Sequence, residues 1–231
     1  MYPGLVQTFS DDDDFFTETK GVRVDAKASL YINEKEIASD TGELQITDKG
    51  LSGIPVFQLS RYIGKALDEK KNVKIKLDYL PQYSYEALEK DIMDRFNKAV
   101  SKEKELNEKL TAEKLFDGIL NSKLETALLK KAHISPTKPL REGLEDKISN
   151  FISLIKEDEV LIKGLNDFDK AQISVGGVPL MEIKESFESN KENGIYILGE
   201  ALNVSGECGG YNLHFAWLSG LIAANDIMDS L

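Results

Sequence analysis

The residues best suited to chemistry lie near the carboxyl end of the chain, where a glycine-rich loop joins an apolar run to a helix. Residues 194–199 (GIYILG) predict a strand, Glu200 follows it, and residues 211–228 predict a helix. The first amides of a helix lack intrahelical acceptors and carry the positive end of the helix dipole. Such a turn suits an electron-rich ligand group, for example a phosphate or a ring carbonyl.

Glu200 and the glycines of this loop also have structural interpretations. At the carboxyl end of a strand, where open α/β sheets bind ligands, Glu200 could accept hydrogen bonds from ligand hydroxyls. The alternative is a partly exposed acid at the end of the strand, without a ligand. Gly209 and Gly210 could serve a ligand, or a turn that needs positive φ, or both.

Other reactive side chains lack the neighbours that catalysis or metal binding requires. His133 and His214 have no partner nearby in sequence, and Ser52 is not in a G-x-S-x-G turn. Cys208 is interpreted as a small loop residue, and the acidic run 11–14 as a solvated loop. No metal site is expected, and no catalytic residue is identified.

The bulk composition restricts the partners and the compartment. The 231 residues include 29 basic and 40 acidic side chains, a net charge of −11 that disfavours nucleic-acid binding. The single cysteine allows no internal disulfide, which suits a reducing compartment. The sequence contains no run of roughly 18 apolar residues and no export signal. A cytoplasmic protein without membrane or nucleic-acid partners is therefore expected.

The first third of the sequence predicts a β-rich unit. Turn signals occur at residues 33–34 and 40–42, and a short helix is expected after the glycines and proline of residues 50–55. The predicted strands are residues 22–31, 32–37, 42–47 and 74–79.

The middle third predicts helices. Ser84 and Thr111 are expected to cap two of them, residues 124–131 form a short one, and another follows Pro139. The apolar positions of this last helix are Leu140, Leu144, Ile148, Ile152 and Ile155.

The last third returns to strands, at residues 160–163 and 171–175, before the terminal strand–loop–helix unit. The fold class is predicted as α+β, a β domain interrupted by an inserted helical subdomain. The predicted divisions are 1–80 (β-rich), 81–158 (helical), 159–180 (return strands) and 181–231 (a strand–helix unit). The terminal helix is expected to pack against a sheet with the face containing Leu213, Trp217, Gly220, Ala224 and Ile227, so that Trp217 lies in the core.

Several ordered motifs carry a resemblance to a known family. They are residues 5–7, 47–60 (TDKGLSGIPVFQLS), 173–178 (ISVGGV), 185–189 (ESFES) and 194–220 (GIYILGEALNVSGECGGYNLHFAWLSG). In this order they resemble the HI0933-like, BaiN-type NAD(P)/FAD-dependent oxidoreductases, also described as aminoacetone-oxidase-like flavoproteins. The resemblance spans nearly the whole chain, although the helical middle matches only in character.

The resemblance implies a set of FAD-contacting residues. They are Gly176, Gly177, Gly199, Glu200, Gly209, Gly210, Tyr211, Asn212 and Leu213. By resemblance Glu200 corresponds to the acid that binds the FAD ribitol, and residues 209–213 lie against the isoalloxazine ring. Asp48 and His214 differ from the family's frequent histidine and glutamine, so no catalytic or proton-transfer role is carried over to them.

The family's G-x-G-x-x-G pyrophosphate loop does not occur in this sequence. The chain is therefore expected to be a carboxy-terminal part of a flavin-dependent, NAD(P)H-linked oxidoreductase, with weak or no FAD binding by itself. Its expected partner is a polypeptide carrying the missing FAD-binding half, or a second copy of the chain. The alternative is a non-catalytic scaffold or interaction protein that retains the fold without the cofactor. No substrate is indicated.

Overall fold

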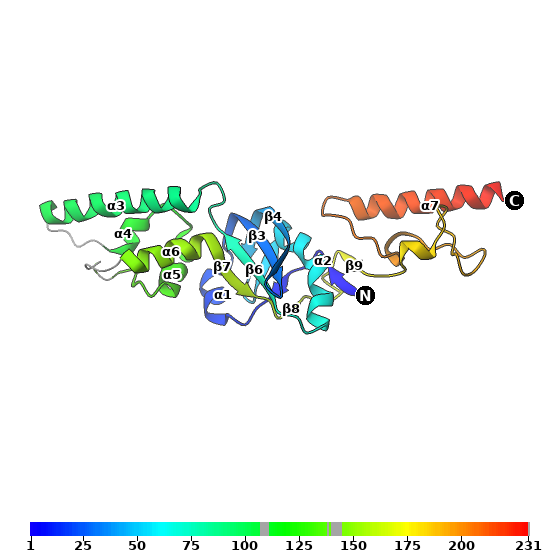
Figure 1. Cartoon of the computed structure of the whole chain (residues 1–231), viewed down its shortest axis with the longest axis horizontal. Coiled ribbons are helices and arrows are strands. Elements are labelled where there is room, and N and C mark those ends of the chain that lie inside the picture. The colour runs from blue at the N-terminus through cyan, green and yellow to red at the C-terminus, as the bar shows by residue number, and fades with distance from the viewer. Residues whose placement is uncertain (107–110, 138, 140–144, 231) are drawn as a thin grey trace.

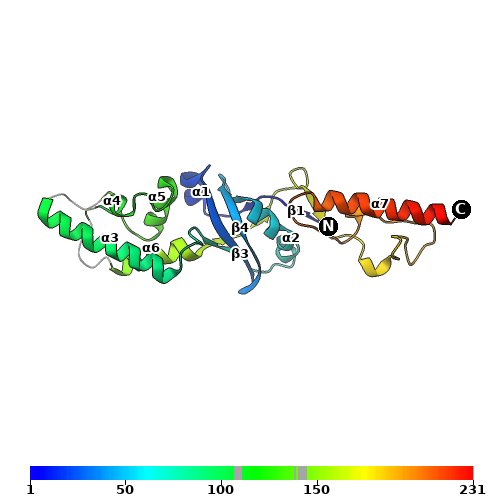
Figure 2. The same ribbon diagram turned by 90° about the horizontal axis from the view of Figure 1, so that it is seen from above.

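The computed structural model describes residues 1–106, 111–137, 139 and 145–230. The molecule is elongated, as Figures 1 and 2 show: a helical lobe lies at one end, a β-sheet in the middle, and helix α7 (Tyr211–Asp229) at the other end. Among the described helices, none is both long enough and apolar enough to cross a membrane.

The central sheet is antiparallel and has five strands in the order β5-β4-β3-β6-β7. Its strands are β3 (Arg23–Ile32), β4 (Lys35–Ile46), β5 (Leu51–Gly53), β6 (Val73–Asp78) and β7 (Asp158–Leu161). Alternation along β3 turns Ala26, Ala28 and Leu30 into the core, whereas the residues between them face outward. The strand pattern predicted for residues 22–31 and 74–79 is thus confirmed.

The predicted turn at residues 40–42 is wrong. Residues 33–34 do form the hairpin turn, and both have positive φ. Strand β4, however, continues unbroken for 12 residues, and Asp40, Thr41 and Gly42 pair with β3 in register. The ladder hydrogen bonds to β3 therefore override the local turn preference of these residues.

Helix α2 (Ile54–Asp68) covers the inner face of the sheet. Pro55 lies in its first turn, where the missing amide costs nothing, and Val56, Leu59 and Ile63 are buried. Two short antiparallel pairings link the beginning of the chain to its return segment: β1 (Tyr2–Gly4) with β9 (Ile173–Val175), and β2 (Thr8–Phe9) with β8 (Gly164–Leu165).

The helical lobe occupies the chain between the paired strands β6 and β7. Its helices are α3 (Tyr85–Leu106), α4 (Ala112–Phe116), α5 (Ser122–Lys131) and α6 (Glu145–Glu157). The predicted caps are confirmed: Ser84 Oγ accepts from the Ala87 amide and Thr111 Oγ1 from the Lys114 amide. Ile148, Ile152 and Ile155 are buried as predicted, whereas Leu140 and Leu144 lie outside the described residues.

The acidic run 11–14 is not simply a solvated loop, because helix α1 (Asp13–Thr19) begins within it. The Asp12 side chain accepts from the Phe15 amide at 3.4 Å and caps the helix. Phe15 and Phe16 are then buried at the junction of the sheet and the helices. The sequence analysis did not predict this short helix, because its first residues belong to the acidic run.

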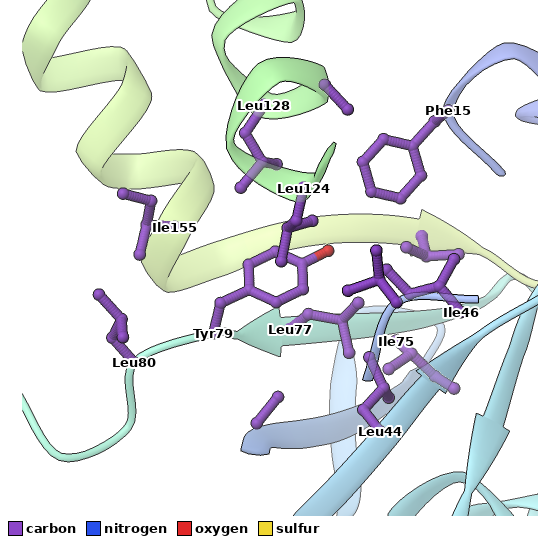
Figure 3. Close-up of a cluster of buried hydrophobic side chains, with 14 of the residues drawn as sticks. Phe15, Leu44, Ile46, Ile75, Leu77, Tyr79, Leu80, Leu124, Leu128 and Ile155 are labelled. Atoms are coloured by element: carbon purple, nitrogen blue, oxygen red, sulfur yellow. The ribbon is translucent and has the colours of Figure 1, made fainter. Parts of the chain in front are cut away.

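The sheet and the helical lobe share one apolar core, part of which Figure 3 shows. Tyr79, directly after β6, packs there among residues that include Leu124, Leu128 and Ile155. Its hydroxyl donates to Asp158 Oδ2 at 2.9 Å, while Lys131 Nζ lies 2.7 Å from Asp158 Oδ1. The buried Asp158 carboxylate is thereby satisfied from both the sheet side and the helical side.

Glu125 in α5 makes folding stability depend on pH. Its carboxyl is largely removed from water, and this burial, reinforced by the charge of Asp117, raises its pKa from 4.5 to about 7. The folded state therefore holds this proton more tightly than the unfolded chain. The associated stabilisation is complete below about pH 4.5 and is lost as the pH rises through about 7.

We expect Glu125→Gln to remove this pH dependence. Urea unfolding should show the variant to be more stable than the parent by about 1–2 kcal/mol at pH 8, after allowance for partial solvation of the carboxylate. At pH 4 the two should be similar. Glu192→Gln, at an exposed position, is the control and should leave the pH profile unchanged. Equal pH profiles for the parent and Glu125→Gln would contradict this assignment.

Candidate cofactor-binding site

The segment before α7 differs from the predicted strand. Residues 194–199 form only a short pairing, in which the Ser189 amide donates to Ile195 O and the Ile197 amide to Phe187 O. The chain then enters the 3-10 turn Gly199–Ala201 (η2). The predicted strand is therefore wrong, because only a short opposing stretch supplies ladder partners in the described part of the chain.

Residues 194–199 pack against one face of α7 and form hydrogen bonds with it. The Gly199 amide donates to the buried Ser219 Oγ at 3.0 Å, and Tyr196 OH donates to Asp226 Oδ2 at 2.7 Å. The hydrogen bond to Asp226 raises the pKa of Tyr196 to about 12. A side chain at Gly199 would place its Cβ 3.1 Å from that of Ala216, so Gly199 permits the close approach of turn and helix.

The opposite face of α7 is exposed and apolar. Leu213 is 72% exposed, Trp217 82% and Leu221 58%. The prediction that Trp217 lies in the core is therefore wrong for this structure, since the helix packs through Ser219 and Ala223 instead. Among the described residues, no sheet covers the Trp217 side of the helix.

The loop preceding α7 is held at both ends. Asn212 Oδ1 accepts from the Gly206 amide at 2.8 Å, and its Nδ2 donates back to Gly206 O at 3.1 Å. From α2, Gln58 Oε1 accepts from the Cys208 amide at 3.3 Å and Arg61 Nη1 donates to Ser205 O at 3.0 Å. These contacts attach the loop to the β-sheet lobe.

Sequence analysis did not identify Gln58 and Arg61. The two residues are three positions apart, so both lie on one side of α2. This spacing was the only feature of the sequence that could have indicated a shared contact. Polar residues on a helix surface are, however, usually solvated, so this spacing does not identify a partner 144 or 150 residues away.

The start of α7 presents free amide donors. Gly210 has φ +92°, and the first helical bond runs from the His214 amide to Gly210 O at 3.0 Å. The amides of Tyr211, Asn212 and Leu213 have no acceptor among the hydrogen bonds that the structure describes. The space in which a Gly210 side chain would stand is open. Convergent amides at an open helix start fit an acceptor oxygen or an anion.

Glu200 lies with the glycine pair that follows β9. Its Oε1 accepts from the Ser174 amide, and its Oε2 has no partner among the described contacts. Gly177 has φ +123°, and a Cβ there would lie 2.5 Å from Ala201 O. The predicted residues thus form two groups: Gly176, Gly177, Gly199 and Glu200 lie around η2, and Gly209–Leu213 lie at the start of α7.

Metal chemistry has no candidate in the described part of the chain. Within residues 1–106, 111–137, 139 and 145–230, no three His, Cys, Asp or Glu side chains are grouped so that they could hold a metal ion. The site offers backbone amides as hydrogen-bond donors and the Glu200 carboxylate as an acceptor, which suit an organic ligand that carries acceptor atoms and hydroxyl groups.

The residues that form the antiparallel sheet and the helical lobe match a known family. Residues 2–173 match the HI0933-like protein barrel and H2TH domain. The chain therefore belongs to the HI0933-like family of flavin-type oxidoreductases.

Two curated relatives match most of this chain. It is 37% identical over 209 residues to the 3-dehydro-bile acid delta(4,6)-reductase of Clostridium scindens, a match that covers 90% of this chain and 49% of the relative. It is 25% identical over 222 residues to the ribosomal RNA dihydrouridine synthase of Haemophilus influenzae, covering 95% of this chain and 50% of that relative. The chain thus spans about half the length of the curated relatives it matches.

The close approach at Gly177 predicts a local defect on substitution. Gly177→Ala combines positive φ with a clash against Ala201 O, and should weaken the hydrogen bonds that join Val178 to Ala201 and Asn203. We expect a loss of about 2–4 kcal/mol in local opening free energy, measured by hydrogen exchange at Val178 and Asn203.

Gly194→Ala provides the matched control. Gly194 also has positive φ, but no atom lies within 4 Å of the point that a Cβ would occupy there. This substitution should cost only about 1–2 kcal/mol and leave exchange at Val178 unchanged. Equal effects of the two substitutions would show that the contact with Ala201 is unimportant.

Proposed function

We propose that this chain supplies part of the FAD site of a flavin-dependent, NAD(P)H-linked oxidoreductase. The observation that carries the proposal is the open start of α7, where the amides of residues 211–213 lack acceptors, in a chain of the HI0933-like family. The relative from Clostridium scindens is itself named a reductase, which supports an oxidoreductase role.

The residues of the two groups have distinct proposed roles. The amides of Tyr211, Asn212 and Leu213 donate to the electron-accepting edge of the flavin ring, where the α7 dipole favours negative charge. Glu200, with Oε2 available, binds hydroxyls of the ribitol chain. The turn at Gly176 and Gly177 lets the backbone pass close to the ring. FAD, when bound, supplies hydride transfer.

The chain divisions are part of the same proposal. We assign residues 1–80 and 159–180 to a substrate-side β domain, 81–158 to an inserted helical subdomain and 181–231 to the FAD-binding domain. The pairing of β6 with β7 across the intervening helices supports the insertion. We also propose a cytoplasmic location, because a single cysteine suits a reducing compartment.

The exposed face of α7 supports a partner polypeptide. Trp217, Leu213 and Leu221 form an apolar surface of a kind that folded proteins usually cover. The 231 residues contain no G-x-G-x-x-G loop, and the matched relatives are about twice as long. We therefore propose that a polypeptide carrying this dinucleotide-binding loop packs on α7 and completes the site; self-association is the alternative.

Flavin binding tests the proposed function. The isolated chain should retain little FAD after gel filtration, because it lacks the pyrophosphate loop. Co-expression with a polypeptide that bears the G-x-G-x-x-G half should yield a complex with stoichiometric flavin, visible by absorbance, and NAD(P)H oxidation. A complex that forms without flavin or activity would favour the scaffold alternative. A stoichiometric yellow flavin in the isolated chain would refute the need for a partner.

Trp217→Asp tests the surface that the partner covers. Because Trp217 is 82% exposed, its replacement should change the stability of the isolated chain by no more than about 0.5 kcal/mol. In the assembled complex it would bury a charge, so co-purification of the partner and its flavin should be lost. Asn225→Asp, which adds the same charge at an exposed polar position of α7, should preserve assembly. Unchanged assembly of Trp217→Asp would exclude this face as the interface.

A further inference from the structure

A pocket lies on the outer face of the sheet, away from the candidate cofactor site. Its volume is about 400 Å³, within the usual range for small-molecule sites. It opens between the outer face of the sheet and the start of α3 and end of α6, and α7 contributes no residue to it. Residues that line it include Lys27, Ser29, Tyr31, Lys76, Tyr85 and Ser153.

Strand register brings the floor of this pocket together. Lys27 on β3 pairs with Asp78 on β6, and Ser29 pairs with Lys76. Since side chains alternate along a strand, these residues share the outer face while Ala26 and Ala28 enter the core. The floor is therefore polar and is built on the adjacent strands β3 and β6.

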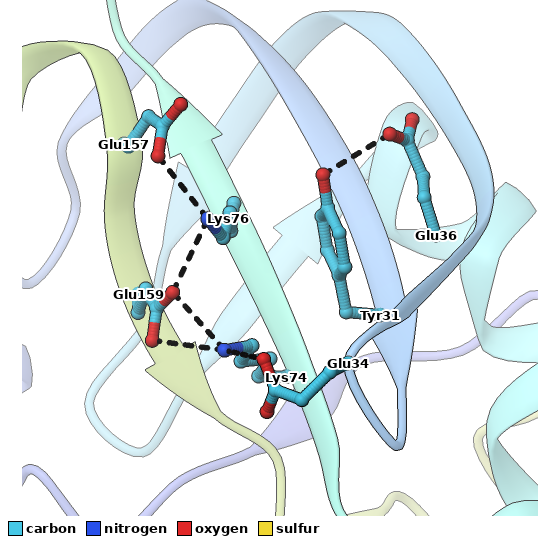
Figure 4. A network of polar contacts seen from close by, with 7 residues as sticks. All are labelled: Tyr31, Glu34, Glu36, Lys74, Lys76, Glu157 and Glu159. Carbon is cyan, nitrogen blue, oxygen red and sulfur yellow. Dashed lines mark hydrogen bonds and ion pairs between the residues drawn. The ribbon is translucent and has the colours of Figure 1, made fainter.

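Two of the three lysines in the pocket are already neutralised. Lys156 Nζ lies 2.7 Å from Asp78 Oδ2 and also donates to two backbone carbonyls. Lys76 Nζ lies 3.1 Å from Glu157 Oε2 and 3.3 Å from Glu159 Oε1. Figure 4 shows Lys76 facing these two acids. Neither lysine presents uncompensated charge to a ligand.

Lys27 is different. Its ammonium group has no hydrogen bond or ion pair among the contacts that the structure describes, and the same holds for the hydroxyls of Ser29 and Ser153. All three can donate hydrogen bonds into the pocket. Glu36, an acid that also lines it, accepts from Tyr31 OH at 3.0 Å (Figure 4). Tyr31 is four residues from Lys27 on β3, about 13 Å along an extended strand.

The pocket thus has a donor end at Lys27 and an aromatic region. Tyr31 and Tyr85 both line it, and the Lys76 ammonium lies 5.2 Å from the centre of the Tyr31 ring. The unpaired Lys27 ammonium can take one negative charge of a ligand at its own end of the pocket, whereas Glu36, which has no cationic partner among the described contacts, lies at the Tyr31 end. Aromatic side chains favour a flat ligand body that can stack or meet their edges.

We propose that this pocket binds a small aromatic monocarboxylate. Its carboxylate lies at Lys27 and accepts from the Ser29 and Ser153 hydroxyls, and its ring lies against Tyr31 and Tyr85. The proposal is independent of the flavin site, because none of these residues belongs to η2 or α7. It assigns a binding function to the sheet's outer face.

Benzoate is the probe for this pocket, and benzamide is its neutral isostere. Titration of the isotope-labelled chain at low ionic strength, followed by NMR, should give saturable shifts at Lys27, Ser29 and Ser153 with benzoate. Benzamide should bind at least about fivefold more weakly, and added salt should weaken benzoate binding. Lys27→Gln should lower benzoate affinity about fivefold or more, whereas Lys98→Gln, at an exposed position on α3, should leave it unchanged.

Three results with the parent chain and Lys27→Gln would overturn the proposal. They are the absence of saturable benzoate binding, equal binding of benzamide, and equal benzoate affinity in the parent and Lys27→Gln. Should Lys27→Gln fail to fold, Ser153→Leu replaces it, because Ser153 is exposed on α6 and a leucine there removes a donor and narrows the pocket. Undiminished binding by Ser153→Leu would likewise refute the assignment.

Discussion

The buried carboxylate of Asp158 joins the central sheet to the helical lobe. It receives a hydrogen bond from Tyr79, at the end of β6, and an ion pair from Lys131, at the end of α5. Lys131 also lies 4.6 Å from the centre of the Phe15 ring in α1. An unpaired carboxylate at this depth would be costly, so the arrangement requires sheet, helical lobe and α1 to be in place together.

Local sequence patterns correctly predicted the elements that are stabilised by interactions between residues close together in sequence. The alternation of residues 74–79 and the capping side chains Ser84 and Thr111 act within a few residues, and the structure confirms them. Elements that depend on distant partners were predicted less well. Residues 40–42 are extended because β3 lies beside them, and residues 194–199 are largely irregular because few strand partners face them.

In the candidate cofactor site, too, local features could be predicted from the sequence, whereas contacts with distant residues could not. Its glycines could be chosen from sequence, and their positive φ values and close contacts agree with backbone roles. The support from Gln58 and Arg61 could not be predicted, because it depends on how α2 meets a loop about 150 residues later. The environment of Trp217 also could not be predicted, since periodicity identifies an apolar face but not what covers it.

The position of the helical lobe between two paired strands has a consequence for biosynthesis. Strand β7 completes the edge of the sheet beside β6, yet residues 79–157 must leave the ribosome before β7 is available. Until then β6 presents an open edge, with backbone groups that another chain could pair with. Closing so long a loop is slow compared with forming hairpin β3–β4. Translation therefore exposes a nascent sheet edge to aggregation for the time needed to synthesise the helices, and early helix formation shortens the distance that closure must span.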